Sequence, residues 1–254
     1  MCWYVNQIQT MNSIINLYFL IRTNLAMMKY FKSTILLLIM ILTACASQYD
    51  YNPVAVPLSQ IQGMRPHVLQ LALRAYHNAQ CLGDVKSPYL TIVDFQKPSN
   101  QKRLWVINMN KKQVLFYTYV THGKNSGGLF ATHFSDRMNS LESSIGVMKT
   151  GFSYRGDEGY SMKIYGLEPG YNDNVDKRYI VMHGATYATE QFAKANGYLG
   201  RTWGCFGVDP DLVVPITRTI RDGSIIFAYY PDKRWLSHSK FLQTNACHKT
   251  THWW

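Results

Sequence analysis

Three observations predict a mainly β domain with a few helices, preceded by one amphipathic helix. Of the 254 residues, 47% are hydrophobic and only 16% are charged, a composition typical of folded rather than disordered chains. Residues 66–80 carry apolar side chains at helical spacing. Between residues 88 and 232, short segments rich in β-branched and aromatic residues alternate with turn-forming residues, as in a β-rich fold.

Residues 1–44 have the order of a bacterial lipoprotein leader. Lys29 and Lys32 precede an apolar run, Ile35 to Leu42, that is shorter than the roughly 20 residues needed to span a bilayer. Leu42-Thr43-Ala44-Cys45 then resembles a lipobox, in which cleavage precedes a cysteine that becomes lipidated. The alternatives are an ordinary signal peptide or a buried helix with an incidental cysteine. Residues 1–26 precede this signal, so we expect Met27 or Met28 to be the true start.

Lipidation of Cys45 would anchor the protein to a membrane on the periplasmic side. Because the non-acidic Ala46 follows it, similarity to Gram-negative lipoproteins implies the outer membrane. Residues 45–64 contain Pro53, Pro57 and Gly63 and lack helical periodicity, which predicts a tether.

The remaining elements follow in order along the chain. An amphipathic helix is expected within residues 65–87, with Pro66 in its first turn. Strands are expected at 89–95, 103–108, 113–123, 161–167, 178–184 and 224–230. Helices are expected at 186–196 and up to Arg221, the second with Pro215 near its start or as a kink. The polar segment 233–254 is expected as a tail, either docked or disordered.

The formal charge of +11 is spread along the chain. No run of basic residues and no nucleic-acid-binding motif occurs, so we expect no nucleic-acid partner. A spread positive charge fits a polyanionic wall equally well.

The five cysteines separate by position. Cys2 lies in the leader and Cys45 at the anchor. Cys81 and Cys247 bracket the globular region, so we expect a disulfide between them, since an oxidising compartment favours pairing. Cys205, in a Gly-flanked turn, is then the free thiol; the alternative is that all three remain reduced.

Two fragments carry candidate chemistry. Ile180-Val181-Met182-His183-Gly184 places His183 at the exit of a predicted strand, and Gly200-Arg201-Thr202-Trp203-Gly204-Cys205 places a cysteine directly after a glycine. A thiol of pKa about 8.5 is barely ionised at neutral pH, so a neighbouring imidazole is needed to take its proton. Backbone N–H groups beside the nucleophile would stabilise an oxyanion. Taken singly, the histidine is more simply a structural residue and the cysteine a small buried hydrophobe.

Together these fragments resemble the L,D-transpeptidases, which carry a strand ending in His-Gly and, about 20 residues later, Ser/Thr-x-Gly-Cys. Thr202-Trp203-Gly204-Cys205 fits this pattern, and the resemblance covers residues 88–232, closest to the murein L,D-transpeptidase catalytic-domain branch. It implies a β-sandwich catalytic domain that acts on peptidoglycan stem peptides without a cofactor. Cys205 would form a thioester with a stem tetrapeptide and release D-Ala, with His183 as the base. An amine of a second stem would then make a 3–3 cross-link.

The resemblance also implies a cleft lined by Gly204, Thr202, Trp203 and Gly184. Trp203 replaces a histidine of the better-known branch, and Gly207 replaces an arginine associated with substrate recognition. The carboxylate-binding group is therefore open. The candidates for substrate binding are Arg201, Arg137, His122, Ser143 and Ser144, whereas for Arg178 a solvated surface position is favoured.

Other functions remain as alternatives. Water in place of the second amine would make the protein an L,D-carboxypeptidase or a hydrolase. A non-catalytic, lipid-anchored wall-binding module is a further alternative, against which the pairing of His183 with Cys205 argues. A general cysteine peptidase is disfavoured, since its usual order of Cys before His is reversed here. A zinc site formed by His122, His133 and His183 lacks compact ligand spacing, so no metal is expected.

Overall fold

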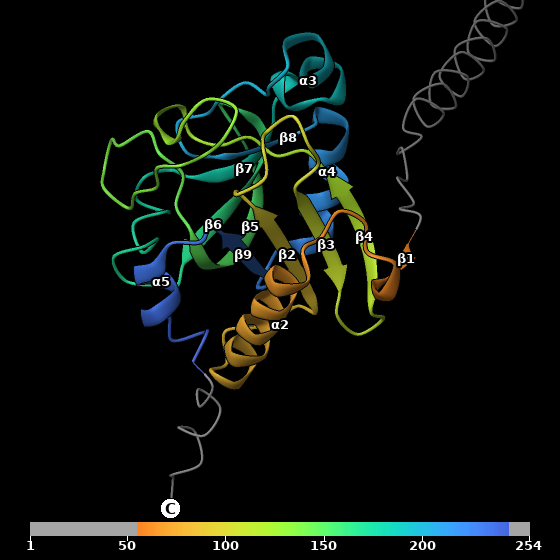
Figure 1. The fold of residues 1–254 in the computed structure, drawn as a ribbon, viewed down its shortest axis with the longest axis vertical. Helices are drawn as coiled ribbons and strands as arrows, with labels where there is room; N and C mark the ends of the chain where they lie inside the picture. The colour runs from red at the N-terminus through yellow and green to blue at the C-terminus, as the bar shows by residue number, and fades with distance from the viewer. Residues whose placement is uncertain (1–54, 244–254) are drawn as a thin grey trace, which may run out of the picture. The chain divides into compact units, whose positions relative to one another are not determined.

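The computed structural model describes residues 55–243, and within them nine strands form one hydrogen-bonded sheet, ordered β1-β4-β3-β2-β9-β5-β6-β7-β8 (Figure 1). The pairs β2–β9 and β7–β8 are parallel and the other neighbours are antiparallel. The strands are β1 (Val56–Pro57), β2 (Tyr89–Asp94), β3 (Leu104–Asn108), β4 (Gln113–Thr118), β5 (Gly146–Gly156), β6 (Gly159–Gly166), β7 (Val181–Gly184), β8 (Phe206–Val208) and β9 (Ile225–Tyr229).

Four α-helices accompany the sheet in this part of the chain: α2 (Pro66–Cys81), α3 (Glu190–Asn196), α4 (Pro210–Ile220) and α5 (Lys233–His238). Figure 1 shows α2 in front of the sheet and α4 behind it. The predicted helix over residues 66–80 is α2, which packs against β9 and β2. It does so by burying Val68, Ala72, Ala75 and Ala79, a helical spacing. The predicted β-rich fold with a few helices is confirmed.

The sheet curves so that its two ends approach each other. The segment after β4 remains extended, and Thr121 donates its N–H to the carbonyl of Gly207 in β8 at 2.9 Å. Next to it, the N–H of Thr202 donates to the carbonyl of His122 at 3.0 Å. The predicted strand 113–123 therefore ends at Thr118 as β4, but its continuation holds the loop that carries Cys205.

Three strands were not expected from the sequence: β1, β5 and β8. Strand β5 contains Gly146, Gly151 and Gly156, which weaken a strand pattern, and its register with β6 shifts between Thr150 and Ser153. Strand β8 has only three residues, too few to show an alternating pattern.

The described part of the predicted tether lies against the sheet. Strand β1 pairs with β4, and the indole Nε1 of Trp105 donates to the carbonyl of Gln62 at 2.9 Å. Residues 56–62 are therefore held by the domain rather than extending freely from it.

The domain also extends beyond residue 232. Trp235 of α5 and Phe241 are fully buried, and the Trp235 indole N–H donates to Glu168 Oε2 at 3.0 Å. Asn78 of α2 donates to the carbonyls of Phe241 and Gln243 at 2.8 and 2.9 Å. The first eleven residues of the predicted polar tail are thus a docked part of the fold, because they supply apolar side chains to its core.

The cysteines in the described region differ in state. Cys81, at the end of α2, is disulfide-bonded, whereas Cys205 is a free thiol. Cys247 lies outside the described residues, so its pairing with Cys81 remains a prediction. The leader, Cys45 and residues 244–254 also lie outside them.

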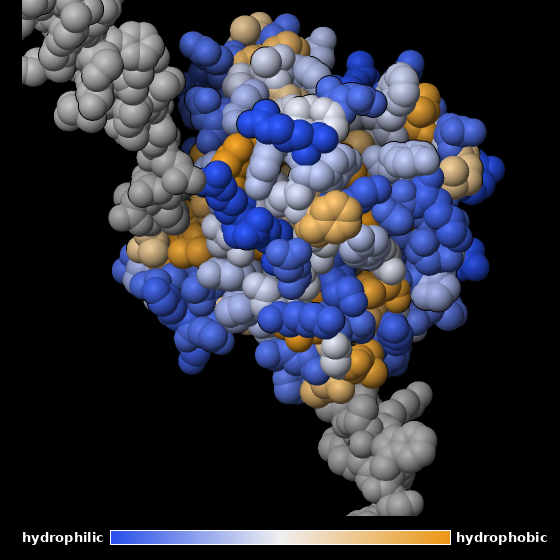
Figure 2. Space-filling view, turned by 180° about the vertical axis from the view of Figure 1, so that it is seen from behind, coloured by the Kyte–Doolittle hydropathy of each residue, from blue (hydrophilic) through white to orange (hydrophobic). Residues whose placement is uncertain are grey.

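The surface seen from behind is mostly hydrophilic, with apolar side chains scattered over it (Figure 2). Between residues 55 and 243, no helix combines the length and apolarity required to cross a membrane.

Candidate active site

The loop that carries Cys205 has a conformation imposed by its neighbours. Gly204 has φ +125°, and a Cβ added there would lie 2.7 Å from the carbonyl oxygen of Glu142, so only glycine fits. The hydroxyl of Thr202 accepts the Gly204 N–H at 3.2 Å and donates to the Cys205 carbonyl at 2.8 Å. Thr202 therefore braces the turn that presents the thiol, and the Gly204 amide is already occupied.

His183 lies beside this loop because β7 and β8 are parallel neighbours. His183 pairs with Gly207, and Cys205 precedes Gly207 by two residues. Since side chains alternate between the faces of a strand, Cys205 and His183 emerge on the same face. Both line one pocket of about 640 Å³, although the side chain of His183 is only 3% exposed.

The tautomer of His183 follows from its backbone contact. Its Nδ1 lies 3.1 Å from the carbonyl oxygen of Gly184, which can only accept a hydrogen bond. The proton of the neutral ring is therefore on Nδ1, and Nε2 holds the lone pair available to take a proton.

The thiol of Cys205 is neutral in the resting state. Its Sγ lies 3.6 Å from the carbonyl oxygen of Tyr179, toward which the S–H donates. Burial is the largest influence and raises the pKa of the thiol; the charge of Glu158 raises it further, whereas the Val181 N–H and Arg178 lower it. Formation of the thiolate therefore requires a base, and the imidazole of His183 lines the same pocket.

Glu158 is a charged neighbour of His183 that sequence patterns did not single out. It lies in the turn between β5 and β6, and its Oε2 is 3.8 Å from Nδ1 of His183. With its side chain 66% exposed, it acts through a largely aqueous environment. Its negative charge disfavours the thiolate of Cys205.

Arg178 lines the pocket as well, so the favoured interpretation of it as a solvated surface residue is wrong. Its Nη1 donates to Ser135 O and Ser144 Oγ at 2.6 and 2.8 Å. Its Nη2 donates to Glu142 O and Ser140 Oγ at 2.5 and 3.0 Å. The guanidinium thereby fixes the loop of residues 135–144 next to the nucleophile.

Three predicted substrate-binding residues are instead buried supports. Ser143 is fully buried, accepts the N–H of Gly123 at 2.9 Å and donates to the carbonyl of Gly204 at 3.3 Å. Ser144 is buried and bonded to Ser135 and Arg178. His122 is fully buried as well, so it does not line the cleft. The polar groups of these side chains are engaged in hydrogen bonds within the protein.

His122 belongs to a network with Arg103, another residue that the sequence did not reveal. Nη2 of the fully buried Arg103 donates to His122 Nδ1 at 2.8 Å, so Nε2 carries the proton and donates to the carbonyl of Gly127 at 3.2 Å. Burial and the charge of Arg103 lower the pKa of His122 to about 4. Neutral His122 therefore helps to hold in place its own backbone segment, whose carbonyl accepts the N–H of Thr202.

Of the remaining predicted site residues, some line the pocket of Cys205 and others lie outside it. Trp203 is 74% exposed and lines the pocket, as does Arg201, whose Nη1 donates to Gly127 O at 3.2 Å. Gly184 does not face the cleft, since a Cβ there would meet Val213 of α4 at 3.1 Å; its carbonyl orients His183 instead. Arg137 is exposed and does not line the pocket.

Across residues 55–243, no three or more His, Cys, Asp or Glu side chains are grouped to hold a metal ion. The pocket is lined by a thiol, an imidazole and charged groups of both signs. Lys177, Arg178 and Arg201 provide positive charge, and Asp157 and Glu158 provide negative charge. A thiol and an imidazole in one pocket are the groups that thiol-dependent acyl transfer requires.

Residues 60–229 match the family model described as the L,D-transpeptidase catalytic domain. The match covers more than half of the chain, and the chain belongs to this family. No curated protein sequence matches it.

Solved structures similar to the chain include L,D-transpeptidases from Mycobacterium smegmatis (13% identity, TM-score 0.36) and Stackebrandtia nassauensis (14%, 0.35). The comparison covers 57% of this chain in both cases, and 59% and 57% of those chains. The helical cell shape determining protein Pgp2 from Campylobacter jejuni is also similar, at 12% identity and TM-score 0.36, over 63% of this chain and 57% of that one. The chain thus spans less than two thirds of these proteins.

Proposed function

We propose that the protein is a peptidoglycan L,D-transpeptidase that uses Cys205 as its nucleophile and His183 as its base. The observation that carries this proposal is the pairing of β7 with β8, which presents both side chains on one face of the sheet and in one pocket. Membership of the L,D-transpeptidase catalytic domain family supports the peptidoglycan substrate.

In the proposed reaction, Nε2 of His183 takes the proton of the Cys205 thiol as a stem tetrapeptide enters. The thiolate attacks the carbonyl that joins the L-centre of the diamino acid to D-Ala. His183 then protonates the leaving amine, so D-Ala departs and a thioester remains. An amine of a second stem attacks the thioester, His183 takes its proton, and a 3–3 cross-link forms as the thiol is regenerated.

The oxyanion of each tetrahedral intermediate needs a backbone donor. Because the Gly204 N–H is bonded to Thr202, we assign this role to the N–H of Cys205. For the carboxylate of D-Ala we assign Arg201, which is exposed at the pocket wall and makes one bond to a carbonyl. Both Nη atoms of Arg178, by contrast, are already taken by the loop that it holds.

The test is to incubate the purified chain with disaccharide-tetrapeptides and to analyse the products by mass spectrometry. We expect cross-linked dimers, free D-Ala and a covalent adduct on Cys205, all absent from the Cys205→Ala variant. Tripeptides without dimers would replace the proposal by an L,D-carboxypeptidase. Binding without any product would indicate a wall-binding module.

We further propose that Cys45 is lipidated and anchors the protein on the periplasmic side, at the outer membrane. The basic, apolar and small residues that precede Cys45 support this proposal. Metabolic labelling with an alkyne fatty acid should label the wild type and spare Cys45→Ser, and the label should fractionate with the outer membrane. Labelling of both proteins, or of neither, contradicts the anchor.

A further inference from the structure

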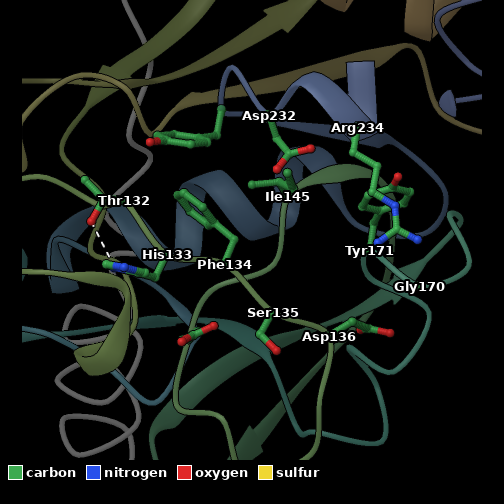
Figure 3. Close-up of a pocket in the computed structure, with 12 residues that line it drawn as sticks. Thr132, His133, Phe134, Ser135, Asp136, Ile145, Gly170, Tyr171, Asp232 and Arg234 are labelled. Carbon is green, nitrogen blue, oxygen red and sulfur yellow. Dashed lines mark hydrogen bonds between the residues drawn. The ribbon is translucent and has the colours of Figure 1, made fainter. Parts of the chain in front are cut away.

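The loop of residues 132–145 contributes to two cavities. Met138, Asn139 and Leu141 line the pocket of Cys205. Phe134 and Glu142, from the same loop, line a second cavity of about 450 Å³ (Figure 3). Figure 3 shows Asp232 and Arg234 entering this cavity from the segment that begins α5, and Thr132 to Asp136 entering from the loop. The proposed reaction uses none of the side chains in this second cavity.

An aromatic pair forms one wall of the cavity. The rings of Phe134 and Tyr230 are 4.6 Å apart between centroids, and Phe134 also packs on the buried Phe95 at 5.4 Å. Because the pair is anchored to the core, its faces are held in place before any ligand arrives. Tyr171 adds a third ring to the lining. Flat, fixed aromatic surface of this kind packs well against the C–H face of a pyranose ring.

Polar groups surround this surface with both donors and acceptors. One carboxylate oxygen of Asp232 accepts the N–H of Trp235 at 2.7 Å, which leaves the other oxygen for a ligand. Glu142 provides a second carboxylate and Arg234, whose side chain is exposed, provides donors. Asp136 contributes less, since its oxygens accept the N–H of Asn174 at 3.0 and 3.2 Å.

This combination matches a polyhydroxylated ring. Neighbouring hydroxyls donate to carboxylates and accept from a guanidinium, while the ring's C–H face covers an aromatic side chain. A simple amine would use the carboxylates but would leave the aromatic wall and Arg234 unused. We propose that the cavity binds sugar residues of a glycan strand.

The position of the cavity fits a strand whose stem peptide enters the pocket of Cys205, an identification that rests on the proposed function. A Cβ on Gly204 would lie 2.7 Å from the carbonyl of Glu142, so the loop that lines the cavity directly adjoins the nucleophile loop. The glycan would thus be held while its stem reaches the thiol.

The experiment measures binding by calorimetry with the full chain carrying Cys205→Ala, so that catalysis plays no part. The probes are glycan strands stripped of stem peptides and a hexamer of N-acetylglucosamine. We expect Tyr230→Ala to weaken binding about tenfold through lost stacking, and Arg234→Ala to weaken it severalfold through lost hydrogen bonds. Arg234→Ala removes an exposed side chain, so a folding defect does not obscure its result. Lys124→Ala, an exposed cation outside this cavity, is the matched control and should bind normally.

Failure to bind either probe, or equal affinity in all variants, would overturn the proposal. A second readout uses the active chain: Arg234→Ala should raise KM for disaccharide-tetrapeptide while leaving KM for the free tetrapeptide unchanged. An equal change for both substrates would also overturn it. Glycan binding by a chain that forms no cross-links would refute the transpeptidase but not the sugar site.

Discussion

Replacement of Gly204 by alanine tests the conformation of the loop that presents the nucleophile. At φ +125° an L-residue is strained, which costs roughly 1–3 kcal/mol. The added methyl would also lie 2.7 Å from the carbonyl of Glu142, a backbone atom that cannot rotate away, and 3.0 Å from Ile180 Cδ1. The loop must therefore shift to accommodate the methyl group, and Cys205 is the next residue.

A shift of the thiol by about 1 Å relative to His183 reduces the rate about 100-fold. We therefore expect kcat/KM of Gly204→Ala to fall by roughly two orders of magnitude. For a domain of this size, Tm should fall by roughly 2–12 °C, the range that corresponds to the strain.

The assay compares the rate of Cys205 acylation, followed by intact mass, with the thermal unfolding of the same samples. Gly128→Ala is the matched control, because Gly128 has nothing within 4 Å of an added Cβ and no positive φ. It should acylate and unfold like the wild type. Normal acylation by Gly204→Ala would refute the argument that this turn positions the nucleophile.

Three further predictions follow from the site. Thr202→Val should lower the unfolding free energy by about 1–3 kcal/mol and slow acylation, because it removes the hydroxyl bonds to the Gly204 N–H and the Cys205 carbonyl. Thr202→Ser keeps the hydroxyl and should restore both the stability and the acylation rate. Equal defects in the two variants would contradict the role of Thr202 in holding the turn. Glu158→Gln should lower the pKa of the Cys205 thiol, so alkylation of that thiol should shift to lower pH, with Asp157→Asn as the control. An unchanged alkylation profile would remove Glu158 from the electrostatics of the site. Because the pKa of His122 is lowered to about 4 in the folded protein, the unfolded chain binds this proton more tightly. Roughly 3 kcal/mol of the unfolding free energy should therefore be lost as pH falls from about 6.5 to about 4. Over that pH range, Tm of His122→Gln should vary less than Tm of the wild type, and a parallel decline of the two would contradict this.

Much of the fold was predictable because its signals are local. The helical spacing of Val68, Ala72 and Ala75 identifies α2, and β-branched and aromatic runs identify β2, β3 and β9. Strands β5 and β8 were missed for a physical reason: glycines obscure one pattern, and three residues are too few to make the other. The docking of residues 233–243 depends on long-range contacts, such as Trp235 with Glu168, that leave no periodic pattern.

The candidate site shows the same division. Cys205 and His183 could be proposed as a nucleophile and a base because their residue types and spacing resemble the L,D-transpeptidase pattern, and both line one pocket. His122, Ser143 and Ser144 were misassigned, since sequence order does not reveal whether a polar side chain faces solvent or a buried partner. Arg178 was misassigned in the opposite direction, because its acceptors are mostly backbone carbonyls of a distant loop.

By itself, the sequence determined which groups are candidates for the proposed chemistry: a glycine that permits the turn, a cysteine after it, and a histidine at a strand end. Only the tertiary structure decided that β7 and β8 are parallel neighbours, which brings that cysteine and histidine to one pocket. It also decided which polar residues support the site from within, since burial and hydrogen bonding depend on segments far apart in the chain. The same long-range packing created the second cavity between residues 132–145 and the start of α5.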